Sequence, residues 1–310
     1  MAGPVMGVMG KWSVGEETTA GTAVTPTNLL EVLDGSDLGM AEEAVDTMGL
    51  SGTRSRKSER TRAGIQRISG RLSLCPNAAE WALLLPWILG ADASGTTFAL
   101  AETLQAFTSE LKKDNATDGK VFTYAGCAVS RATITSEAGG PVRLDLDIEA
   151  MTETVGNAGT ATSLTLNVAT GPFLHSDSSA AVTVGGTAYP VPRATIVIDN
   201  MLDTERFLNS TTRAAIPTRG REITVTLDPP YGNSTAAYPT AATLAAGVAV
   251  AVTYTNTVHA VSMLLSFVKV HFPRRSPAWN GREEMLLPLS GVAKETSSTK
   301  EVVITLDSTP

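Results

Sequence analysis

Few residues in this sequence have the types and the spacing that chemistry requires. Its three histidines, His175, His259 and His271, are far apart, and none belongs to a His-x-x-x-His pair of the kind that binds zinc. The sequence has no nucleotide-binding Gly-rich loop, no Gly-x-Ser-x-Gly elbow and no Cys-x-x-Cys pair. Its two cysteines, Cys75 and Cys127, are too few for a disulfide framework and lie in or beside predicted strands as small apolar residues. The sequence therefore predicts no catalytic residue, no metal site and no cofactor.

One row of carboxylates deserves a separate interpretation. Asp145, Asp147 and Glu149 alternate with apolar residues, so they share one face of a predicted strand. Such a row can bind a hard cation, but a solvated outer strand face is the favoured interpretation.

The strongest charged feature is basic. Residues 54–71 contain seven Lys or Arg residues and one acid, Glu59, so this segment carries +6 and the remainder of the −7 chain carries −13. A solvated loop is the simplest interpretation, and a nucleic-acid patch is disfavoured because the segment has no aromatic side chains for base stacking. We favour a cationic arm that docks on an acidic surface of another copy, a head-to-tail contact that generates rings and filaments. The candidate contact residues are Arg54, Arg56, Lys57, Arg60 and Arg62.

The elements that position these residues are predicted to be mainly β-strands. Alternation of apolar and polar residues is clearest over residues 142–148, which follow a Gly-Gly-Pro turn and form a hairpin with residues 127–135. The 41 threonines support this class, because threonine is β-branched and favours pleated surfaces. The other predicted strands cover residues 68–74, 164–168, 223–227, 248–252, 261–272 and 302–306.

Helix is predicted at one place only. Asn77 with Glu80 three residues later forms a capping box before an apolar run that ends at Gly90. Pro86 is expected to kink or end this short buried helix. Residues 103–113 fit helical spacing and strand composition equally, so their state stays open.

The chain divides by composition into three parts. Residues 1–51 have little periodicity and are expected to form an extended N-terminal arm. Residues 52–155, which include the basic loop 54–71, are expected to form a first β-sandwich unit, and residues 156–310 a second; a single composite β domain over residues 52–310 is the alternative. A short repeat supports duplication, since a Gly-Arg pair, an alternating strand and a proline occur both at residues 69–76 and at residues 219–229.

Composition excludes several classes of protein. The net charge of −7 argues against a sequence-wide basic surface for DNA or anionic lipid. The longest apolar stretch, residues 81–91, is too short to span a bilayer, and we find no secretory signal at the N-terminus. We therefore expect a soluble intracellular product.

Several segments, in order along the chain, resemble the tail tube proteins (major tail proteins) of long-tailed, siphovirus-type bacteriophages. The arginine-rich loop and the strand after it are similar to a loop and strand of that family, and the Leu-Leu-Pro…Gly stretch follows them there too. Each motif is structural and weak alone, so their order carries the resemblance, which spans about residues 12 to 292. The similar segments are residues 51–62, 68–74, 83–90, 124–129 with the hairpin to 148, 198–200 and 273–289.

The resemblance implies a structural virion protein and no enzyme. It implies a β-sandwich or split-barrel fold with one flanking helix, whose subunits close into sixfold or pseudo-sixfold rings around a β-barrel lumen. Stacked rings then form a tube that DNA crosses during ejection, without sequence-specific binding. If the duplication is real, three chains make a pseudo-hexameric ring; otherwise a homohexamer is expected, and we favour the trimer.

Partners and place follow from the same resemblance. The expected partners are other copies of the chain and the tape measure, tail terminator and distal tail proteins, in a phage tail assembled from chains made in the host bacterial cytoplasm. Asp145, Asp147 and Glu149 are the candidates for a lumen face that repels DNA phosphates. The alternative function is a β-sandwich surface decoration or adhesion module that binds glycans; a hydrolase and a basic nucleic-acid binder rank below it.

Overall fold

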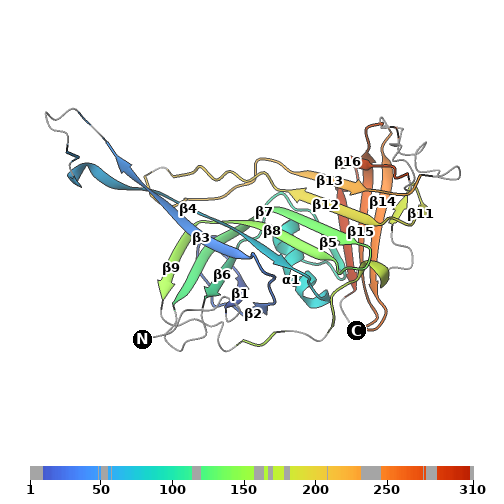
Figure 1. Cartoon of the computed structure of the whole chain (residues 1–310), viewed down its shortest axis with the longest axis horizontal. Coiled ribbons are helices and arrows are strands. Elements are labelled where there is room, and N and C mark those ends of the chain that lie inside the picture. Colours follow the sequence, from blue (N-terminus) through green and yellow to red (C-terminus); the bar gives the residue numbers. More distant parts are fainter. Residues whose placement is uncertain are drawn as a thin grey trace.

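The computed structural model describes residues 10–47, 49, 55–56, 58–113, 120–156, 164–166, 170–177, 182–207, 209–231, 246–274, 276 and 285–307. These residues form a mainly β protein with antiparallel strand ladders and one α-helix, α1 (Ala78–Leu89) (Figure 1). The strands are β1 (Lys11–Glu16), β2 (Asn28–Leu30), β3 (Asp37–Asp46), β4 (Thr61–Leu74), β5 (Thr97–Ala99), β6 (Phe107–Lys112), β7 (Val121–Glu137), β8 (Arg143–Ala150), β9 (Thr152–Gly156), β10 (Val182–Val184), β11 (Thr187–Tyr189), β12 (Arg193–Asp199), β13 (Glu222–Leu227), β14 (Val248–Asn256), β15 (Val261–His271), β16 (Leu289–Lys294) and β17 (Val302–Asp307).

Eight strands follow one another in a continuous run of ladders, which we call the main sheet. Their order is β3–β4–β8–β7–β12–β13–β16–β15, and every neighbouring pair is antiparallel. The two ends of this order, β3 and β15, lie on opposite sides of the molecule (Figure 1). Within the described residues β3 has β4 as its one ladder partner, so it is an edge strand.

Two long strands leave the main sheet and build further ladders. Residues 121–127 of β7 pair with β6 and β9, and β6 pairs with β1, which pairs with β2. Most of β15 pairs with β14 and β17, and β14 pairs with β10, which pairs with β11. Gly126 sits where β7 changes partners, with a φ of 65° and a position at which a Cβ would strike the side chain of Met151.

The core lies on one face of the main sheet. Along β8, Leu144, Leu146 and Ile148 are buried, as the alternation of the sequence predicts. Helix α1 supplies the largest buried side chains to this core, and its Trp87 stacks on Phe107 of β6 with ring centroids 4.4 Å apart. Burial of such apolar area, at about 25 cal/mol per Å², is the main stabilising contribution to the fold.

Helix α1 begins and ends as the sequence predicts. The Asn77 side chain accepts a hydrogen bond from the Glu80 amide at 3.0 Å, and the Glu80 carboxylate accepts one from the Asn77 amide at 2.9 Å. Gly90 closes the helix in the left-handed region, with a φ of 93°. Pro86 does not end the helix, which continues to Leu89. Its missing N–H removes one helical hydrogen bond, but the last turn is buried in the core, and this packing compensates for the loss.

Other expectations have mixed outcomes. The strands predicted at residues 68–74, 127–135, 142–148, 223–227, 248–252, 261–272 and 302–306 are confirmed as parts of β4, β7, β8, β13, β14, β15 and β17. Residues 103–113, left open above, contain strand β6. Of the strand predicted at residues 164–168, the structure describes residues 164–166, which form an isolated bridge from Leu166 to Leu29 and no strand; residues 167 and 168 lie outside the described residues.

The N-terminal segment is more structured than its composition suggests. Residues 11–46 contain β1, β2 and β3, and Trp12 and Val14 of β1 are buried in the core. Sequence periodicity missed β1 because Trp12 and Val14 are its only apolar side chains, too few to show an alternation. The proposed division of the chain at residues 51 and 155 remains a prediction. No helix among the described residues is long and apolar enough to cross a membrane.

Candidate assembly surfaces

The most exposed regular element is a two-stranded ribbon formed by β3 and β4. We call its described residues within 40–67 the ribbon; it projects away from the body of the molecule (Figure 1). From Glu42 to Asp46 every residue is exposed, and so are residues 58–63 on the opposite side of the turn. A two-stranded ribbon standing alone in water is marginally stable, so this element is suited to being covered by another molecule.

The predicted contact residues Arg56, Arg60 and Arg62 all lie on the ribbon and are exposed. The Arg56 guanidinium lies 3.5 Å from the carboxylate of Asp46, and the carbonyl of Arg60 accepts a hydrogen bond from the Thr47 amide at 3.4 Å. The other two predicted contact residues, Arg54 and Lys57, lie outside the described residues. The basic segment therefore lies on the projecting element, and its role in contacts between copies remains a prediction.

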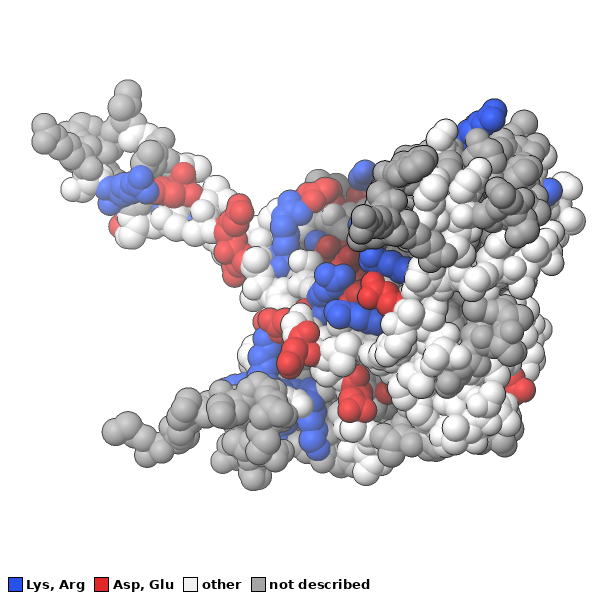
Figure 2. All heavy atoms as spheres, turned by 45° about the vertical axis from the view of Figure 1, so that its right-hand side comes forward, with Lys and Arg blue, Asp and Glu red and all other residues white. Residues whose placement is uncertain are grey.

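The basic run is partly neutralised within its own chain. The antiparallel register places the acidic strand β3 beside the basic start of β4. The described ribbon residues include four arginines and four carboxylates, and one arginine, Arg56, forms an ion pair with Asp46 across the ribbon. The arginines are Arg56, Arg60, Arg62 and Arg67, and the carboxylates are Glu42, Glu43, Asp46 and Glu59. Figure 2 shows both colours along the ribbon and over the adjoining surface of the body. The ribbon consequently presents mixed charge, not the purely cationic surface that the segment alone indicated.

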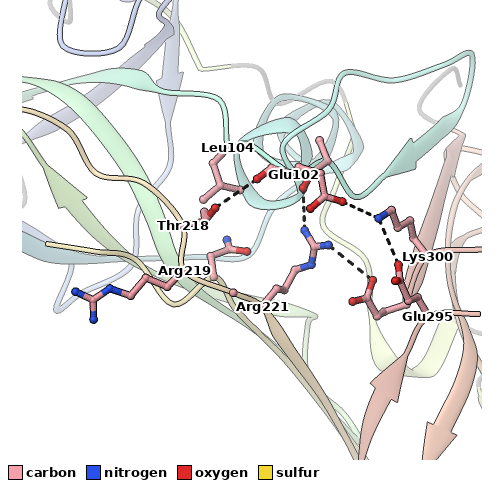
Figure 3. A pocket seen from close by; sticks show the side chains of 11 residues that line it. Glu102, Leu104, Thr218, Arg219, Arg221, Glu295 and Lys300 are labelled. Atoms are coloured by element: carbon pink, nitrogen blue, oxygen red, sulfur yellow. Dashed lines mark hydrogen bonds and ion pairs between the residues drawn. The ribbon is translucent and has the colours of Figure 1, made fainter.

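A polar pocket of about 400 Å³ lies between the segment after β5, the start of β13 and the segment between β16 and β17 (Figure 3). Lys300 Nζ lies 2.7 Å from Glu102 and 3.3 Å from Glu295, and these contacts raise the pKa of Lys300. Arg221 donates to the carbonyl of Ala101 at 2.9 Å. These contacts join distant parts of the chain, and such paired charges are typical of a structural seam.

The carboxylate row on β8 lies on the face of the main sheet opposite the core. Asp145 accepts hydrogen bonds from Arg143, at 3.0 and 3.1 Å, and from the hydroxyl of Ser73. Asp147 lies 3.9 Å from Arg71, whose guanidinium also lies 3.7 Å from Asp145. Arginines therefore balance the negative charges of Asp145 and Asp147, so this part of the strand face is not purely acidic.

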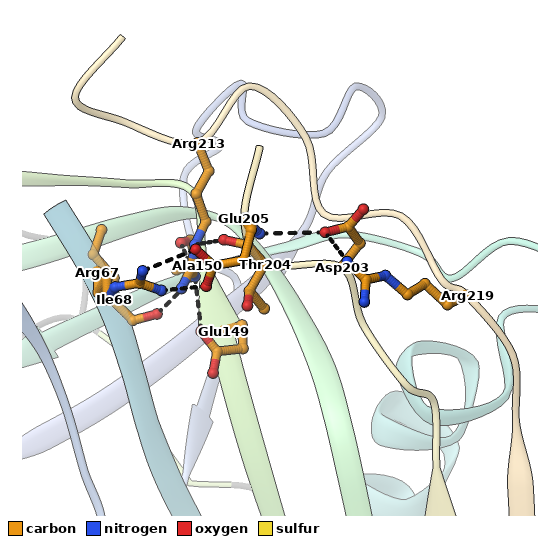
Figure 4. Close-up of polar contacts among 9 residues, drawn as sticks. All are labelled: Arg67, Ile68, Glu149, Ala150, Asp203, Thr204, Glu205, Arg213 and Arg219. Atoms are coloured by element: carbon orange, nitrogen blue, oxygen red, sulfur yellow. Dashed lines mark hydrogen bonds and ion pairs between the residues drawn. The ribbon is translucent and has the colours of Figure 1, made fainter. Parts of the chain in front are cut away.

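The third carboxylate of the row, Glu149, is held by a residue that sequence analysis missed. Arg213 has 3% of its side chain exposed, and its guanidinium lies 2.7 Å from Glu149 (Figure 4). The same guanidinium donates to the carbonyls of Ile68 and Ala150, at 3.1 and 3.0 Å, and to that of Thr204 at 3.1 Å. Burial raises the pKa of Glu149, and the nearby Arg213 opposes that rise.

Arg213 belongs to the long loop that connects β12 to β13, residues 200–221, which we call the brace. The brace runs back along the main sheet to the base of the ribbon (Figure 1). There Glu205 binds Arg67 through both carboxylate oxygens, with one N–O distance of 2.8 Å, and the Gln66 amide donates to the carbonyl of Thr211 at 2.8 Å. The brace therefore anchors the ribbon where it leaves the body.

The brace also contains an exposed charge cluster of its own. Asp203 accepts from the Glu205 amide at 3.3 Å, from Arg219 at 2.8 Å and from Arg206 at 3.2 Å, and these bonds lower the pKa of Asp203. The hydrogen bond from Arg67 lowers the pKa of Glu205 in the same way. Both carboxylates consequently stay ionised below their ordinary range and hold the brace closed near neutral pH.

Comparison with known proteins supplies the family. A family model described as phage tail tube protein matches residues 9–303 of this chain. A search of curated protein sequences finds no significant match. The matched range includes the ribbon, the carboxylate row and the brace, and it favours the structural interpretation of the sequence over an adhesion module, a hydrolase or a nucleic-acid binder. This chain belongs to the phage tail tube protein family and is a structural, non-enzymatic component of the phage tail.

Proposed function

We propose that three copies of this chain close into one ring of the tail tube, each copy supplying two equivalent β units. A ring of three two-unit chains has pseudo-sixfold symmetry. Stacked rings then form the conduit through which the genome leaves the virion. A ring of six chains, each a single composite domain, is the alternative.

The order of strand pairing is the observation that carries this proposal. In the first half of the chain the ladders are β1–β2, β1–β6, β6–β7, β7–β9, β7–β8, β8–β4 and β4–β3. In the second half they are β10–β11, β10–β14, β14–β15, β15–β17, β15–β16, β16–β13 and β13–β12. Each strand of the first series has one equivalent in the second, with the corresponding pairing partners. This correspondence supports the interpretation of the two halves as tandem units.

The short sequence repeat falls on equivalent strands of this scheme. Residues 69–76 lie at the end of β4 and residues 219–229 lie across β13, and both strands end just before a proline-containing turn. Aligned from their last residues, Leu72 and Leu74 match Val225 and Leu227, and all four side chains are buried. The match therefore supports duplication when it is counted from the proline end.

The surface opposite the core is our candidate for the lumen. Besides Asp145, Asp147 and Glu149, it carries small hydroxyl side chains on neighbouring strands, such as Thr133 of β7 and Thr224 of β13. Arginines that are paired with carboxylates attract phosphate weakly, and so do neutral hydroxyl groups. DNA would therefore pass without being retained.

A charge reversal tests the lumen assignment. Asp147 has 47% of its side chain exposed, so Asp147→Lys leaves the core unchanged, removes one of the two carboxylates near Arg71 and adds a cation. We expect virions with this substitution to eject DNA more slowly and with stronger dependence on salt, because unpaired cations bind phosphates. Ejection as fast as that of the parent, with tubes of normal appearance, would show that these residues do not line the lumen.

The ribbon is our candidate for contact between subunits and between rings. Arg54, Arg56, Lys57, Arg60 and Arg62 are the proposed contact residues, and the exposure of the described ones supports this role. Tape measure, tail terminator and distal tail proteins are the further proposed partners, at the lumen and at the two tube ends.

Electron microscopy of tubes assembled from the purified chain tests the ring architecture. The proposal predicts a hollow tube in which each ring repeats three times at high resolution and approximately six times at low resolution. Rings with six identical repeats would contradict the two-unit assignment and leave the tube function intact.

A further inference from the structure

We propose that the open edge of β3 pairs with the end of β15 in a neighbouring copy, with residues 36–39 antiparallel to residues 271–274. The inference rests on the proposed two-unit ring and names the strands and the register through which one copy meets the next. Its template is a junction already present within the chain.

The template is the ladder between β7 and β12, which joins the first half of the main sheet to the second. The pairing scheme makes β15 the equivalent of β7 and β3 the equivalent of β12. The ladder of β6 with β7 ends at Cys127, and β12 begins to pair at Arg131. The ladder of β14 with β15 ends at Val270, which corresponds to Ser130 in the register derived below, so an equivalent of β12 can pair from His271 onward. The edge of β15 beyond Val270 is thus the place where an equivalent of β12 belongs.

The register on the β3 side follows from the paired strands. Four residues before the end of β4 lies Gly70, which faces Leu38 in β3. Four residues before the end of β13 lies Ile223, which faces Ile198 in β12. Leu38 therefore takes the place of Ile198.

The register on the β15 side follows in the same way. The last residue of β4 faces Leu144, and two residues further along β8 Leu146 faces Ala132 in β7. In the second half, the last residue of β13 faces Leu289, and two residues further along β16 lies Gly291. The ladder of β15 with β16 ends at the pair of His271 and Val292, and its continuation by one residue places Phe272 opposite Gly291. Phe272 therefore takes the place of Ala132. Since Ile198 pairs with Ala132, Leu38 of one copy is assigned to Phe272 of the next.

The side chains at this assigned pair suit the junction. Leu38 and Phe272 are both buried on the core side, as Ile198 and Ala132 are in the template. Pairing there places these two buried apolar side chains of neighbouring copies side by side.

The backbone also suits this register. In the template the Asn200 amide donates to the carbonyl of Ser130 at 2.8 Å, which fixes the alternation of hydrogen-bonded and non-bonded pairs along the ladder. Pro273 falls at the place of Thr133, whose backbone groups point toward β8 and away from β12. The missing N–H of Pro273 therefore removes no hydrogen bond from the junction.

The carbonyl of Leu38 points away from β4, as the register requires. It accepts a hydrogen bond from the hydroxyl of Tyr124 at 2.8 Å, and a carbonyl oxygen can accept a second. An edge strand of this length with open backbone groups is a template for strand addition, and pairing with a second copy satisfies it without aggregation.

Paired cysteines test the register directly. Gly39 and His271 correspond to Asp199 and Arg131, a non-bonded pair whose side chains form an ion pair at 3.1 Å. Such positions have Cα atoms about 4.5 Å apart, within the range of a disulfide. A Cβ at Gly39 meets no heavy atom within 4 Å, so Gly39→Cys introduces no clash.

The experiment compares Gly39→Cys/His271→Cys with the matched pair Ala41→Cys/His271→Cys, which is displaced by two residues on the same face. Both are assembled, oxidised and run on non-reducing gels beside the parent and the single variants, which control for Cys75 and Cys127. We expect the first pair to give a ladder of linked chains that ends at three, and the displaced pair to remain largely monomeric.

The possible failures are distinguishable. Rings seen by microscopy without the first cross-link, or with equal cross-linking of the displaced pair, would overturn the junction and leave the ring standing. A ladder that ends at six chains would support the junction and contradict the three-chain ring. A chain that forms neither rings nor links would contradict both.

Discussion

The ribbon and the brace are connections at equivalent places in the strand-pairing scheme, but they meet opposite surroundings. The brace, between β12 and β13, folds back on its own chain and has Arg213 almost completely buried. The ribbon, between β3 and β4, projects and is exposed over most of its length. The first half of the chain therefore supplies a binding surface for the brace, whereas the described residues offer the ribbon no such surface, and we propose that another copy supplies it.

The largest effect is expected from neutralising the ribbon. Arg54→Ala/Arg56→Ala/Arg60→Ala should abolish tubes, because the proposed contacts between copies are lost. The unfolding midpoint of the single chain should stay close to that of the parent, since Arg56 and Arg60 are exposed. Electron microscopy and denaturant unfolding measure the two properties. Tubes of normal length from this variant would show that the ribbon arginines are not needed for assembly.

The second effect concerns the brace. Arg213→Ala should lower the free energy of unfolding by about 3 kcal/mol, because it leaves Glu149 and three backbone carbonyls without their buried partner. Urea unfolding followed by circular dichroism measures this loss. Arg219→Ala is the matched control, since that side chain is 66% exposed and its removal should change stability little. Equal losses in the two variants would show that the burial of Arg213 is not what anchors the brace.

A smaller effect is expected from acid. The pKa values of Asp203 and Glu205 are lowered by their hydrogen bonds in the folded chain, so the stabilisation they provide is present above their unfolded pKa values and is lost as pH falls through the folded ones. Glu149 has the opposite sign, because its folded pKa is raised. We expect the brace to loosen below about pH 4.

Amide exchange over residues 200–221, corrected for the intrinsic effect of pH, follows this loosening. Arg67→Ala removes the partner of Glu205 and should reduce the difference between neutral and acid conditions. Exchange that is equally slow at both pH values would show that the core contacts of Arg213 alone hold the brace.

Local patterns predicted the elements that depend on nearby residues. The alternation in β8 and the capping box at Asn77 are both set within a few residues, and both are present in the structure. The Arg213 contacts had no such local pattern, because its partners Ile68, Glu149 and Ala150 lie far away in the chain.

The charge pattern was only half informative for a related reason. The basic run located the ribbon, but its neutralisation by β3 depends on a hairpin register that composition does not contain. The Gly-Arg pairs of the short repeat also differ in surroundings, since Arg71 is 54% exposed and Arg221 14% exposed, so the proposed duplication aligns the two segments from their proline ends. Strand pairing supplies the alignment that the short motif did not.

The mass of a single ring tests the central claim of two equivalent units per chain most directly. Native mass spectrometry of rings released from purified tubes should give three chains of 32.3 kDa each. Rings of six chains would contradict the two-unit account and favour a single composite domain repeated six times.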